Sequence, residues 1–408
     1  MKAKTYKITS LIKCPMFLLL CVLSALCVSI SAQDWKTVRD GIEYAEVTRE
    51  IGGLKVNMNL LRLDLTKVRL DVHHAMDAAI GTEKTSSIAT RHGAFAAINA
   101  GFFRLDTSIW AGDAAGILKI DGDLLSESNN GRIALLIKNF APETKVAISK
   151  LDINIDLFCV RNWRNPRDRH SCPGHGTRIA GVNRERKENE SVVYTPEFNR
   201  TTLTSNDGLE LVIAKNKVIK INNGIGSNVI PSDGFVLSAT GTSREKLKDI
   251  RVGDLLFYAL PKIAKYSSNP RPDGSDNEKT DYFDDIIGGV PQLVKNGKID
   301  ITWEQEKSTK SFVETRHPRT AVAKLKDGKF LMITVDGRTE ASGGIDLYDL
   351  AAYLLELGAT DAMNLDGGGS TTMFVDGKVV NHPSDKEGER KVSDTILVTL
   401  RKTKIRKR

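Results

Sequence analysis

The sequence lacks the signatures of several common enzyme classes. It contains no Gly-x-Ser-x-Gly, no His-Glu-x-x-His and no Gly-x-Gly-x-x-Gly that opens a helix. These absences argue against serine hydrolases with a nucleophile elbow, zinc hydrolases and dinucleotide-binding enzymes. The 33 glycines follow no fixed period, which excludes a collagen-like chain. The balance of 40% hydrophobic and 27% charged residues excludes both a polytopic membrane protein and a disordered chain.

The central part of the chain also lacks an excess of charge of either sign. The formal net charge is +8 over 408 residues. Residues 1–32 contain four lysines and no acid, and residues 401–408 contain six lysines and arginines and no acid. Residues 33–400 therefore carry a net charge of −2 and show no basic stripe, so nucleic acid is not an expected partner.

Residues 1–32 are typical of a secretory signal peptide. Lysines at the start precede an apolar run over residues 15–30, and small residues follow up to Ala32. We expect cleavage near Ala32 and a secreted or periplasmic mature chain without a transmembrane segment. A lipid anchor and an uncleaved anchor are the alternatives. Leucine precedes both Cys21 and Cys27, which disfavours a lipid anchor, and the apolar run is short for a membrane span.

After that cleavage the chain keeps two cysteines, Cys159 and Cys172. Two cysteines thirteen positions apart in an exported protein can form one disulfide, and two free thiols are the alternative. His170 and His175 flank Cys172, but their spacing fits no standard zinc pattern. We therefore expect a disulfide. The residues identify no cofactor and no metal ligand, and a requirement for a divalent metal is left open.

Strand-like patterns dominate the remaining sequence. Residues 59–65 and 68–72 alternate with the period-2 pattern of half-buried strands, and residues 330–335 form an apolar run that suits a buried strand. A helix is predicted over residues 345–357, where apolar residues recur at helical spacing and Gly358 supplies the stop signal.

We expect an α+β fold with a single strand-rich domain over residues 35–400, built on a mixed sheet with a few helices. No internal repeat, heptad array or strong linker divides this region. Residues 267–282 are rich in Ser, Asn, Pro, Asp and Gly, and are predicted to form a loop or lid. Residues 401–408 form a basic tail, expected to be disordered, with binding to a polyanionic surface as the alternative.

The segment Asp366-Gly-Gly-Gly-Ser370 is the first candidate for chemistry. Three successive glycines let a ligand approach the main chain, and their amides can converge on an anion. Ser370 and Thr371 add hydroxyl groups, and Asp366 can act as a general acid or base, accept a bond from a sugar hydroxyl, or bind a metal. A tight turn with a capping aspartate is the alternative. The segment is not a P-loop, because no Gly-Lys-Ser/Thr follows.

Two arginines and a histidine lie within the segment Arg316-His-Pro-Arg-Thr320. This composition suits a phosphate, because arginine offers bidentate donors and histidine can move a proton near neutral pH. A solvated basic turn is the alternative.

Three other segments place polar, aromatic or glycine residues at expected turns. Asn99-Ala-Gly-Phe-Phe103 offers an amide and aromatic faces to a sugar ring, or is a turn followed by core phenylalanines. Asp336-Gly-Arg338 follows the predicted buried strand, and an exposed ion pair is its alternative. Gly288-Gly-Val-Pro-Gln292 is a stiff turn that can present backbone groups to a ligand, or is simply a turn.

Taken together and in order, these segments resemble the phosphodiester glycosidase family. The resemblance covers about residues 40–400, and the set of motifs is far more specific than any one of them. The matching segments are Ile98-Asn-Ala-Gly-Phe-Phe103, Gly288-Gly-Val-Pro291, His317-Pro-Arg-Thr-Ala321, Val335-Asp-Gly-Arg338 and Asn364-Leu-Asp-Gly-Gly-Gly-Ser370.

The resemblance implies an exported hydrolase that cleaves sugar-1-phosphodiester bonds of the N-acetylglucosamine-1-phosphate type in a polysaccharide or glycan. Phosphate is already a good leaving group, so little acid assistance is needed. A carboxylate would direct water or stabilise an oxocarbenium-like sugar, and cationic donors would stabilise the departing phosphate. The expected catalytic residues are Asp366, Asp336, Arg319 and His317. The expected substrate-binding residues are Asn99, Gly101, Phe102, Phe103, Gly289, Arg316, Thr320, Arg338, Asn364, Gly367, Gly368, Gly369, Ser370 and Thr371.

Two other functions are alternatives. One is a non-catalytic carbohydrate-binding or exopolysaccharide accessory protein that uses the same cleft. The other is a metal-dependent phosphoesterase, which breaks the P–O bond instead of the C–O bond. The expected partner is a sugar-phosphate glycan or a small sugar-1-phosphodiester.

Overall fold

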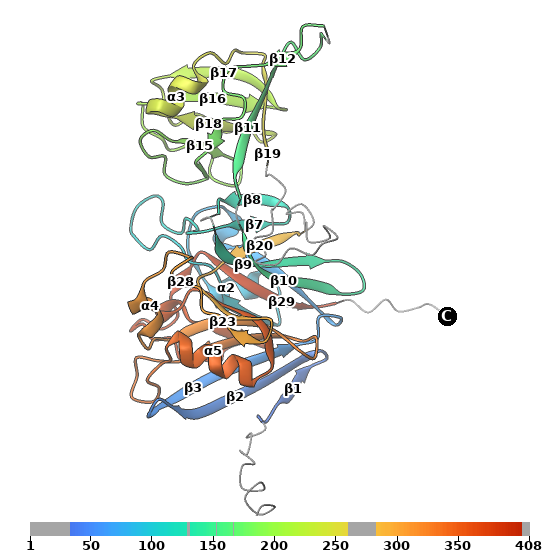
Figure 1. The fold of residues 1–408 in the computed structure, drawn as a ribbon, viewed down its shortest axis with the longest axis vertical. Helices are drawn as coiled ribbons and strands as arrows, with labels where there is room; N and C mark the ends of the chain where they lie inside the picture. Colours follow the sequence, from blue (N-terminus) through green and yellow to red (C-terminus); the bar gives the residue numbers. More distant parts are fainter. Residues whose placement is uncertain (1–32, 129–130, 152, 166, 260–282, 402–408) are drawn as a thin grey trace, which may run out of the picture. The chain divides into compact units, whose positions relative to one another are not determined.

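The computed structural model describes residues 33–128, 131–151, 153–165, 167–259 and 283–401 (Figure 1). The predicted signal peptide at 1–32, the predicted loop at 267–282 and residues 402–408 of the predicted tail lie outside the described residues. The described residues from Trp35 onward belong to one compact unit. No helix of the described residues is long and apolar enough to cross a membrane.

The predicted α+β class is confirmed, because strands dominate the described residues and helices are few and short. One sheet has the order β1(Lys36–Arg39), β2(Ile42–Ile51), β3(Leu54–Leu63), β24(Phe330–Val335), β23(Arg319–Leu325), β25(Ala359–Asn364), β21(Gln292–Lys295), β22(Lys298–Ile299). A second has the order β27(Lys378–Val379), β26(Met373–Val375), β6(Ala96–Asn99), β29(Asp394–Leu400), β4(Val68–His74). We call these the β24 sheet and the β6 sheet.

Two further sheets complete the main framework. The third, called the β20 sheet, has the order β10(Thr144–Leu151), β9(Arg132–Asn139), β20(Asp285–Gly288), β7(Leu118–Ile120), β8(Asp123–Ser126). The fourth has the order β12(His170–Ser171), β11(Ile155–Arg161), β19(Leu255–Ala259), β17(Lys217–Asn223), β16(Leu209–Ala214), β18(Gly234–Ala239), β15(Ser191–Tyr194), β14(Gly181–Val182), with β13(Arg178–Ile179) paired to β11. The parallel pair β14–β15 makes this fourth sheet mixed. A small ribbon joins β5(Glu83–Lys84) to β28(Lys391–Val392).

The helices are short and pack beside the sheets. They are α2(Thr85–Arg91), α3(Gly241–Leu247), α4(Lys310–Glu314) and α5(Leu347–Glu356), with 3-10 turns η2(Ala75–Asp77) and η4(Gly368–Ser370). The predicted helix near 345–357 is confirmed as α5. The carboxylate of Asp346 caps its first turn by accepting from the amides of Tyr348 and Asp349 at 3.0 and 2.9 Å. Gly358 follows with a φ of +90°.

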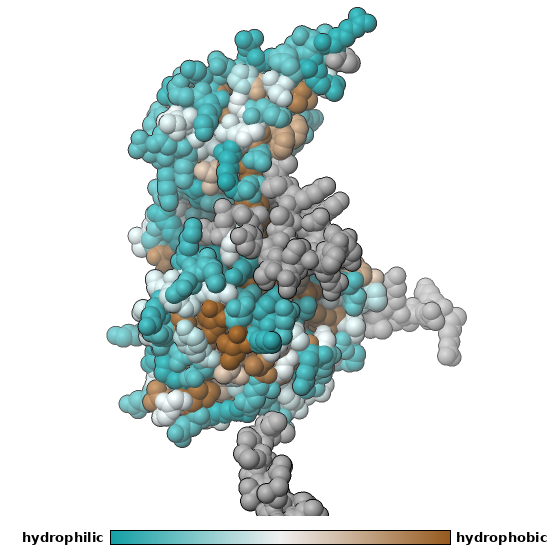
Figure 2. All heavy atoms as spheres, viewed as in Figure 1, coloured by the Kyte–Doolittle hydropathy of each residue, from teal (hydrophilic) through white to brown (hydrophobic). Residues whose placement is uncertain are grey.

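The apolar face of α5 closes one side of the β24 sheet. Leu347, Leu350 and Leu354 are fully buried and belong to one cluster with strand residues such as Leu331 and Ile333. β24 is buried on both faces, so Phe330 and Met332 point away from α5 and join Leu61 and Leu63 of β3 in a second core cluster. Hydrophilic side chains cover most of the face shown in Figure 2, and apolar side chains gather there in separate patches.

Antiparallel pairing brings distant motifs to shared sheet edges. In the β24 sheet, Arg319 pairs with Val335 and Ala321 pairs with Asn364, so the start of β23 lies beside the ends of β24 and β25. The segments that precede β23 and follow β24 and β25 therefore emerge at one edge. In the β6 sheet, Thr395 pairs with Asn99, which places the start of β29 beside the end of β6. The register of the β24 sheet thus brings three of the sequence motifs to one edge.

Candidate active site

The loop after β25 contains three glycines because neighbouring groups fill the space that side chains would need. A Cβ atom on Gly367 would lie 2.8 Å from the carbonyl oxygen of Pro318. One on Gly369 would overlap the side chains of Arg390 and Asp385. The main chain of the loop is therefore held against polar groups from other parts of the fold, as expected for a loop that presents its backbone to a ligand.

Gly368 lies against the guanidinium of Arg338. A Cβ atom on Gly368 would lie 3.1 Å from Arg338 Nη2, and Gly368 adopts a φ of +61° that suits glycine. Arg338 itself has a φ of 62°, which is unusual for a side chain of this size and is characteristic of functional sites. Arg338 is exposed, and within the described part of the chain it forms no ion pair with a carboxylate. Its guanidinium is free to meet an anion.

His317 lies beside this arginine. Its Nδ1 atom is 3.3 Å from Arg338 Nη2. Partial burial, followed by the positive charges of Arg319 and Arg338, lowers the pKa of His317. The imidazole is therefore neutral at neutral pH and can accept the hydrogen bond from the guanidinium.

Asp366 begins the glycine loop, and hydrogen bonds of its backbone fix its position. Its amide donates to the carbonyl oxygen of Ala100 at 2.9 Å, and its carbonyl oxygen accepts from Asn99 Nδ2 at 2.7 Å. Its Oδ1 atom accepts from the Gly367 amide at 2.9 Å. Burial raises the pKa of Asp366 to about 6, and the interactions with Ser370, the Gly367 amide and Arg390 oppose that rise. This carboxyl group can gain or lose a proton near neutral pH.

A second carboxyl group, Asp394 at the start of β29, lies close enough for its charge to raise the pKa of Asp366. Asp394 is fully buried and accepts from the Gly101 amide at 2.5 Å and from Ser393 Oγ at 2.7 Å. Burial raises the pKa of Asp394, and the positive charge of His74 opposes that rise. Two interacting carboxyl groups at one loop are the usual equipment of a glycosidase.

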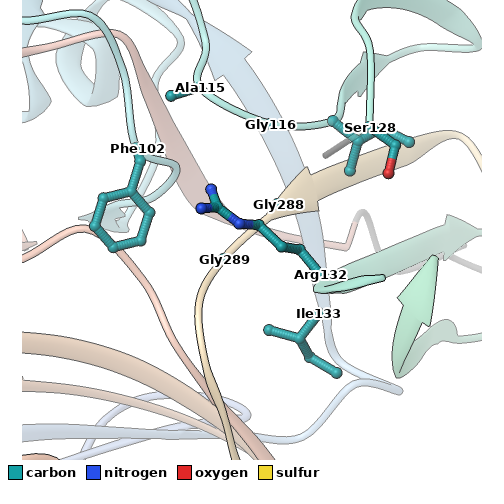
Figure 3. A pocket seen from close by; sticks show the side chains of 9 residues that line it. Phe102, Ala115, Gly116, Ser128, Arg132, Ile133, Gly288 and Gly289 are labelled. Carbon is teal, nitrogen blue, oxygen red and sulfur yellow. The ribbon is translucent and has the colours of Figure 1, made fainter. Parts of the chain in front are cut away.

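A pocket opens beside these carboxyl groups. Its walls include Phe102, Ile133 and the glycine pair Gly288–Gly289, and Figure 3 shows the guanidinium of Arg132 reaching across it toward Phe102. Asp394 and Gly101 line an adjoining part of the same hollow. A Cβ atom on Gly289 would overlap the carbonyl oxygen of Asn364, so glycine is needed for this close approach. An aromatic face, a cation and a carboxyl group thus border one space.

A larger polar cavity of about 340 Å³ continues from this pocket. It shares Ala115, Gly116 and Ser128 with the Phe102 pocket, and its other walls are mostly charged. These charged residues are Asp113, Glu127, Arg184 and Lys187. Burial, followed by the charge of Glu127, raises the pKa of Asp113 to about 7.

Two of the predicted phosphate donors are directed elsewhere. Arg319 is buried and donates through Nη2 to the carbonyl oxygens of Phe312 and Thr315, both at 2.7 Å, and through Nε to that of Ile345 at 3.2 Å. Burial lowers the pKa of Arg319 to about 10. Arg316 donates to Asp349 and to two backbone carbonyl oxygens. The structure therefore corrects the expectation that these two guanidinium groups face a phosphate, because backbone carbonyl groups hold them.

Two other predicted substrate-binding residues, Asn99 and Asn364, lie at the ends of the glycine loop. Asn99 Oδ1 accepts from Thr320 Oγ1 at 2.8 Å and from the Thr372 amide at 3.0 Å, and Asn99 is fully buried. Asn364 Nδ2 donates to the carbonyl oxygen of Val290 at 2.7 Å. These amides fix the two ends of the glycine loop, so in this structure their side chains support the site from behind.

Asp336 is buried and anchors the chain that follows β27. It accepts from the His382 amide at 3.0 Å and from Asn381 Nδ2 at 3.3 Å, and its Oδ2 atom lies 3.3 Å from His382 Nδ1. Burial raises the pKa of Asp336, and these hydrogen bonds oppose the rise. Phe103 is half-buried and bridges to Ala114, behind the pocket that Phe102 faces.

The hydroxyl groups that follow the glycines are buried. Among the described residues, Thr371 Oγ1 and Thr372 Oγ1 are buried and make no hydrogen bond. Ser370 Oγ interacts with the carboxylate of Asp366 and lowers its pKa.

The structure pairs Cys159 with Cys172 in a disulfide whose Cα atoms are 5.4 Å apart. Their sulfur atoms are therefore bonded to each other and are not thiolate ligands. His175 is held at the same place, where its Nδ1 atom lies 3.2 Å from the Cys159 amide.

Sequence reasoning missed three charged residues at the site. They are Asp394, which approaches Asp366, Arg390, which Asp385 holds with two bonds at 2.7 and 2.9 Å, and Arg132 in the Phe102 pocket. Ser-Asp before the last strand is the one local signal that could have indicated Asp394. No local sequence pattern distinguishes Arg390 and Arg132, and only the fold brings them to the site.

Residues 207–399 match the phosphodiester glycosidase family model. The predicted resemblance to the phosphodiester glycosidase family is confirmed. The matched region includes the segments that carry His317, Arg338, the glycine loop and Asp394, whereas the Asn99–Phe103 segment precedes it.

Among the curated relatives is the bovine (Bos taurus) N-acetylglucosamine-1-phosphodiester alpha-N-acetylglucosaminidase. It is 38% identical over 168 residues, which cover 39% of this chain and 29% of that protein. A prophage-derived protein of Bacillus subtilis is 40% identical over 107 residues, covering 26% of this chain and 16% of that protein. The chain thus matches less than a third of the length of either relative.

Two crystal structures share the fold over most of the chain. A protein from Synechocystis superposes with a TM-score of 0.72 and 21% identity, covering 91% of this chain and 64% of that chain. A protein from Burkholderia pseudomallei superposes with a TM-score of 0.69 and 23% identity, covering 85% and 74%.

Proposed function

We propose that this protein is an exported glycosidase that hydrolyses the bond between a sugar C1 atom and phosphate in a sugar-1-phosphodiester glycan. The observation that carries the proposal is the glycine loop, where Asp366 has a pKa of about 6 and two guanidinium groups, those of Arg338 and Arg390, press against the following glycines. A carboxyl group and cationic donors at one loop suit the hydrolysis of such a bond, because the carboxylate can act on the sugar while the donors stabilise the departing phosphate.

Asp366 supplies the carboxylate of the proposed reaction. As a carboxylate, it directs water to the sugar or stabilises positive charge on the ring. Asp394 is more deeply buried, and burial raises its pKa. It accepts from the Gly101 amide and from Ser393 Oγ, and thereby holds the chain that leads to Phe102.

The phosphate would bind on the cationic side of the loop. Arg338 has no carboxylate partner among the described residues, and Arg390 keeps one face of its guanidinium on Asp385. Both guanidinium groups would interact most strongly with the phosphate when negative charge develops on it in the transition state. An interaction that strengthens in the transition state lowers the activation barrier of hydrolysis. Neutral His317 accepts from Arg338 and fixes its direction.

The pocket beside Phe102 has a volume of only about 10 Å³, room for about one water molecule, so the sugar ring would lie in the adjoining cavity of about 340 Å³. The charged walls of that cavity would meet the rest of a glycan.

Export is supported by the sequence pattern of residues 1–32 and by the disulfide between Cys159 and Cys172, which is typical of oxidising compartments.

The decisive experiment measures release of free sugar from a panel of sugar-1-phosphodiesters, including UDP-N-acetylglucosamine. Wild type is compared with Asp366→Asn and with Asp361→Asn, a control on the same strand β25 whose carboxylate pairs with Lys295 at 2.9 Å. We expect turnover by wild type and by the control, and at least about 100-fold less by Asp366→Asn.

Hydrolysis in ¹⁸O-labelled water identifies the bond that breaks. Label in the sugar supports glycosidase chemistry, and label in the phosphate would instead establish a phosphoesterase. Binding of these compounds with no turnover by wild type would favour the non-catalytic carbohydrate-binding alternative.

A further inference from the structure

Two histidines and an aspartate, none of them part of a motif of the candidate active site, converge at one place. His73 lies near the end of β4, Asp77 lies in the turn η2, and His92 follows α2. One ligand atom from each of the three side chains lies within 4.8 Å of the other two. The two imidazole rings stack with centroids 3.7 Å apart.

The turn that carries Asp77 is held in an uncommon conformation. Met76 and Asp77 have φ values of 59° and 53°, so two successive residues other than glycine adopt left-handed backbone. This conformation is costly for both residues and is characteristic of functional sites. Its effect is to direct the Asp77 carboxylate to the histidine pair.

The surroundings of His92 Nε2 are contradictory for a hydrogen-bonding atom. This nitrogen lies 3.0 Å from Asp77 Oδ1, which only accepts, and 3.0 Å from Arg91 Nη1, which only donates. A proton on this nitrogen suits Asp77 but repels the N–H group of Arg91. A lone pair suits Arg91 but repels the carboxylate of Asp77. Arg91 Nη1 also contacts Asp77 Oδ2, so the guanidinium places positive charge at the point where the ligand atoms meet.

We propose that His73, Asp77 and His92 bind a divalent first-row metal ion such as Zn²⁺. Imidazole nitrogen and carboxylate oxygen are established zinc ligands, and three protein ligands leave at least one position for water. The ion replaces Arg91 Nη1 and resolves the conflict at His92, because the lone pair then faces the cation. Arg91 keeps a partner when displaced, since its Nη2 atom already bonds to Glu83 at 2.9 Å.

The ion would join the end of β4 to the end of α2. Successive side chains of a strand point to opposite faces, so His73 meets the metal while His74 points the other way. His74 contacts the carbonyl oxygens of Ala75 and Gly112 at 3.1 Å and lies near the buried carboxyl group of Asp394. Metal binding would therefore stabilise the strand that carries this buried histidine without entering the active site.

The test uses the full mature chain without a histidine tag, stripped with chelator and titrated with Zn²⁺ in a calorimeter. Co²⁺ absorption in the visible range reports the geometry independently. The variants are Asp77→Asn, which tolerates the left-handed turn, and His92→Ala. His170→Ala, an exposed histidine of β12, is the matched control. Arg91→Ala removes the competing guanidinium.

We expect one zinc ion per chain and a rise in Tm with Zn²⁺. Each ligand variant should lose more than the roughly 10–100-fold in affinity that removal of an outer partner costs. His170→Ala should bind as wild type does, and Arg91→Ala should bind more tightly. Absence of zinc binding to wild type would overturn the proposal. This holds even if Arg91→Ala binds zinc, because the Arg91 guanidinium would then occupy the metal position in the native protein. Binding that survives both Asp77→Asn and His92→Ala would overturn it as well.

Discussion

Replacing Asp366 by asparagine is expected to stabilise the protein at neutral pH while abolishing its activity. Burial raises the pKa of Asp366 from 3.8 to about 6. One pKa unit corresponds to about 1.4 kcal/mol, so the shift of roughly two units means that the ionised carboxylate lowers the free energy of unfolding by about 3 kcal/mol. Asparagine keeps the acceptor for the Gly367 amide and carries no charge.

The pH dependence gives the sign of this effect. Below about pH 4 the carboxyl group is protonated in both the folded and the unfolded chain, and wild type has its full stability. As the pH rises from about 4 to about 6, the unfolded chain releases its proton first, and wild type loses stability. The advantage of Asp366→Asn should therefore grow from near zero to about 3 kcal/mol by pH 7. Loss of repulsion with Asp394 acts in the same direction.

Urea unfolding at one-unit steps from pH 4 to pH 8 measures this difference directly. Asp361→Asn is again the control, and loss of its ion pair with Lys295 should cost at most about 1 kcal/mol at every pH. If Asp366→Asn is less stable than wild type throughout, or if the difference between them does not change with pH, the carboxyl group is not strained by burial. The assignment of Asp366 as a group poised to transfer protons would then be wrong.

Three further predictions test the site. With Asp366 acting as a carboxylate, kcat/KM should rise as the pH passes through about 6, and a pH–rate profile that falls there would reverse its role. Arg338→Ala should lower kcat/KM about 100-fold with an unchanged Tm, whereas Arg319→Ala should cost at least about 3 kcal/mol in urea unfolding, because three backbone carbonyl groups lose their donor. The opposite pattern would show that the two arginines exchange roles. Gly289→Ala should cost about 1–3 kcal/mol, because the new methyl group overlaps the carbonyl oxygen of Asn364; an unchanged thermal melt would contradict that close approach.

Local sequence patterns predicted the elements that depend on neighbours along the chain. The apolar spacing and the stop at Gly358 were sufficient for α5, and the apolar run at 330–335 was sufficient for β24. The glycine loop was also predictable, since three successive glycines are rarely tolerated without a close neighbour. The sequence left open what that neighbour is, and the structure identifies it as Pro318, Arg338 and the Arg390–Asp385 pair.

The sequence by itself determined the class of fold, the resemblance to the phosphodiester glycosidase family and the identity of the motifs, because all three depend on residue order and local spacing. The tertiary structure alone decided which charged groups serve the site. Arg319 and Arg338 look equivalent in the sequence, but backbone carbonyl groups hold one and the other faces the glycine loop. Asp394 becomes the partner of Asp366 only because antiparallel register sets the start of β29 beside the end of β6, which adjoins the glycine loop. Which charged side chains reach the glycine loop depends on their positions in space, and strand pairing sets those positions whereas local sequence does not.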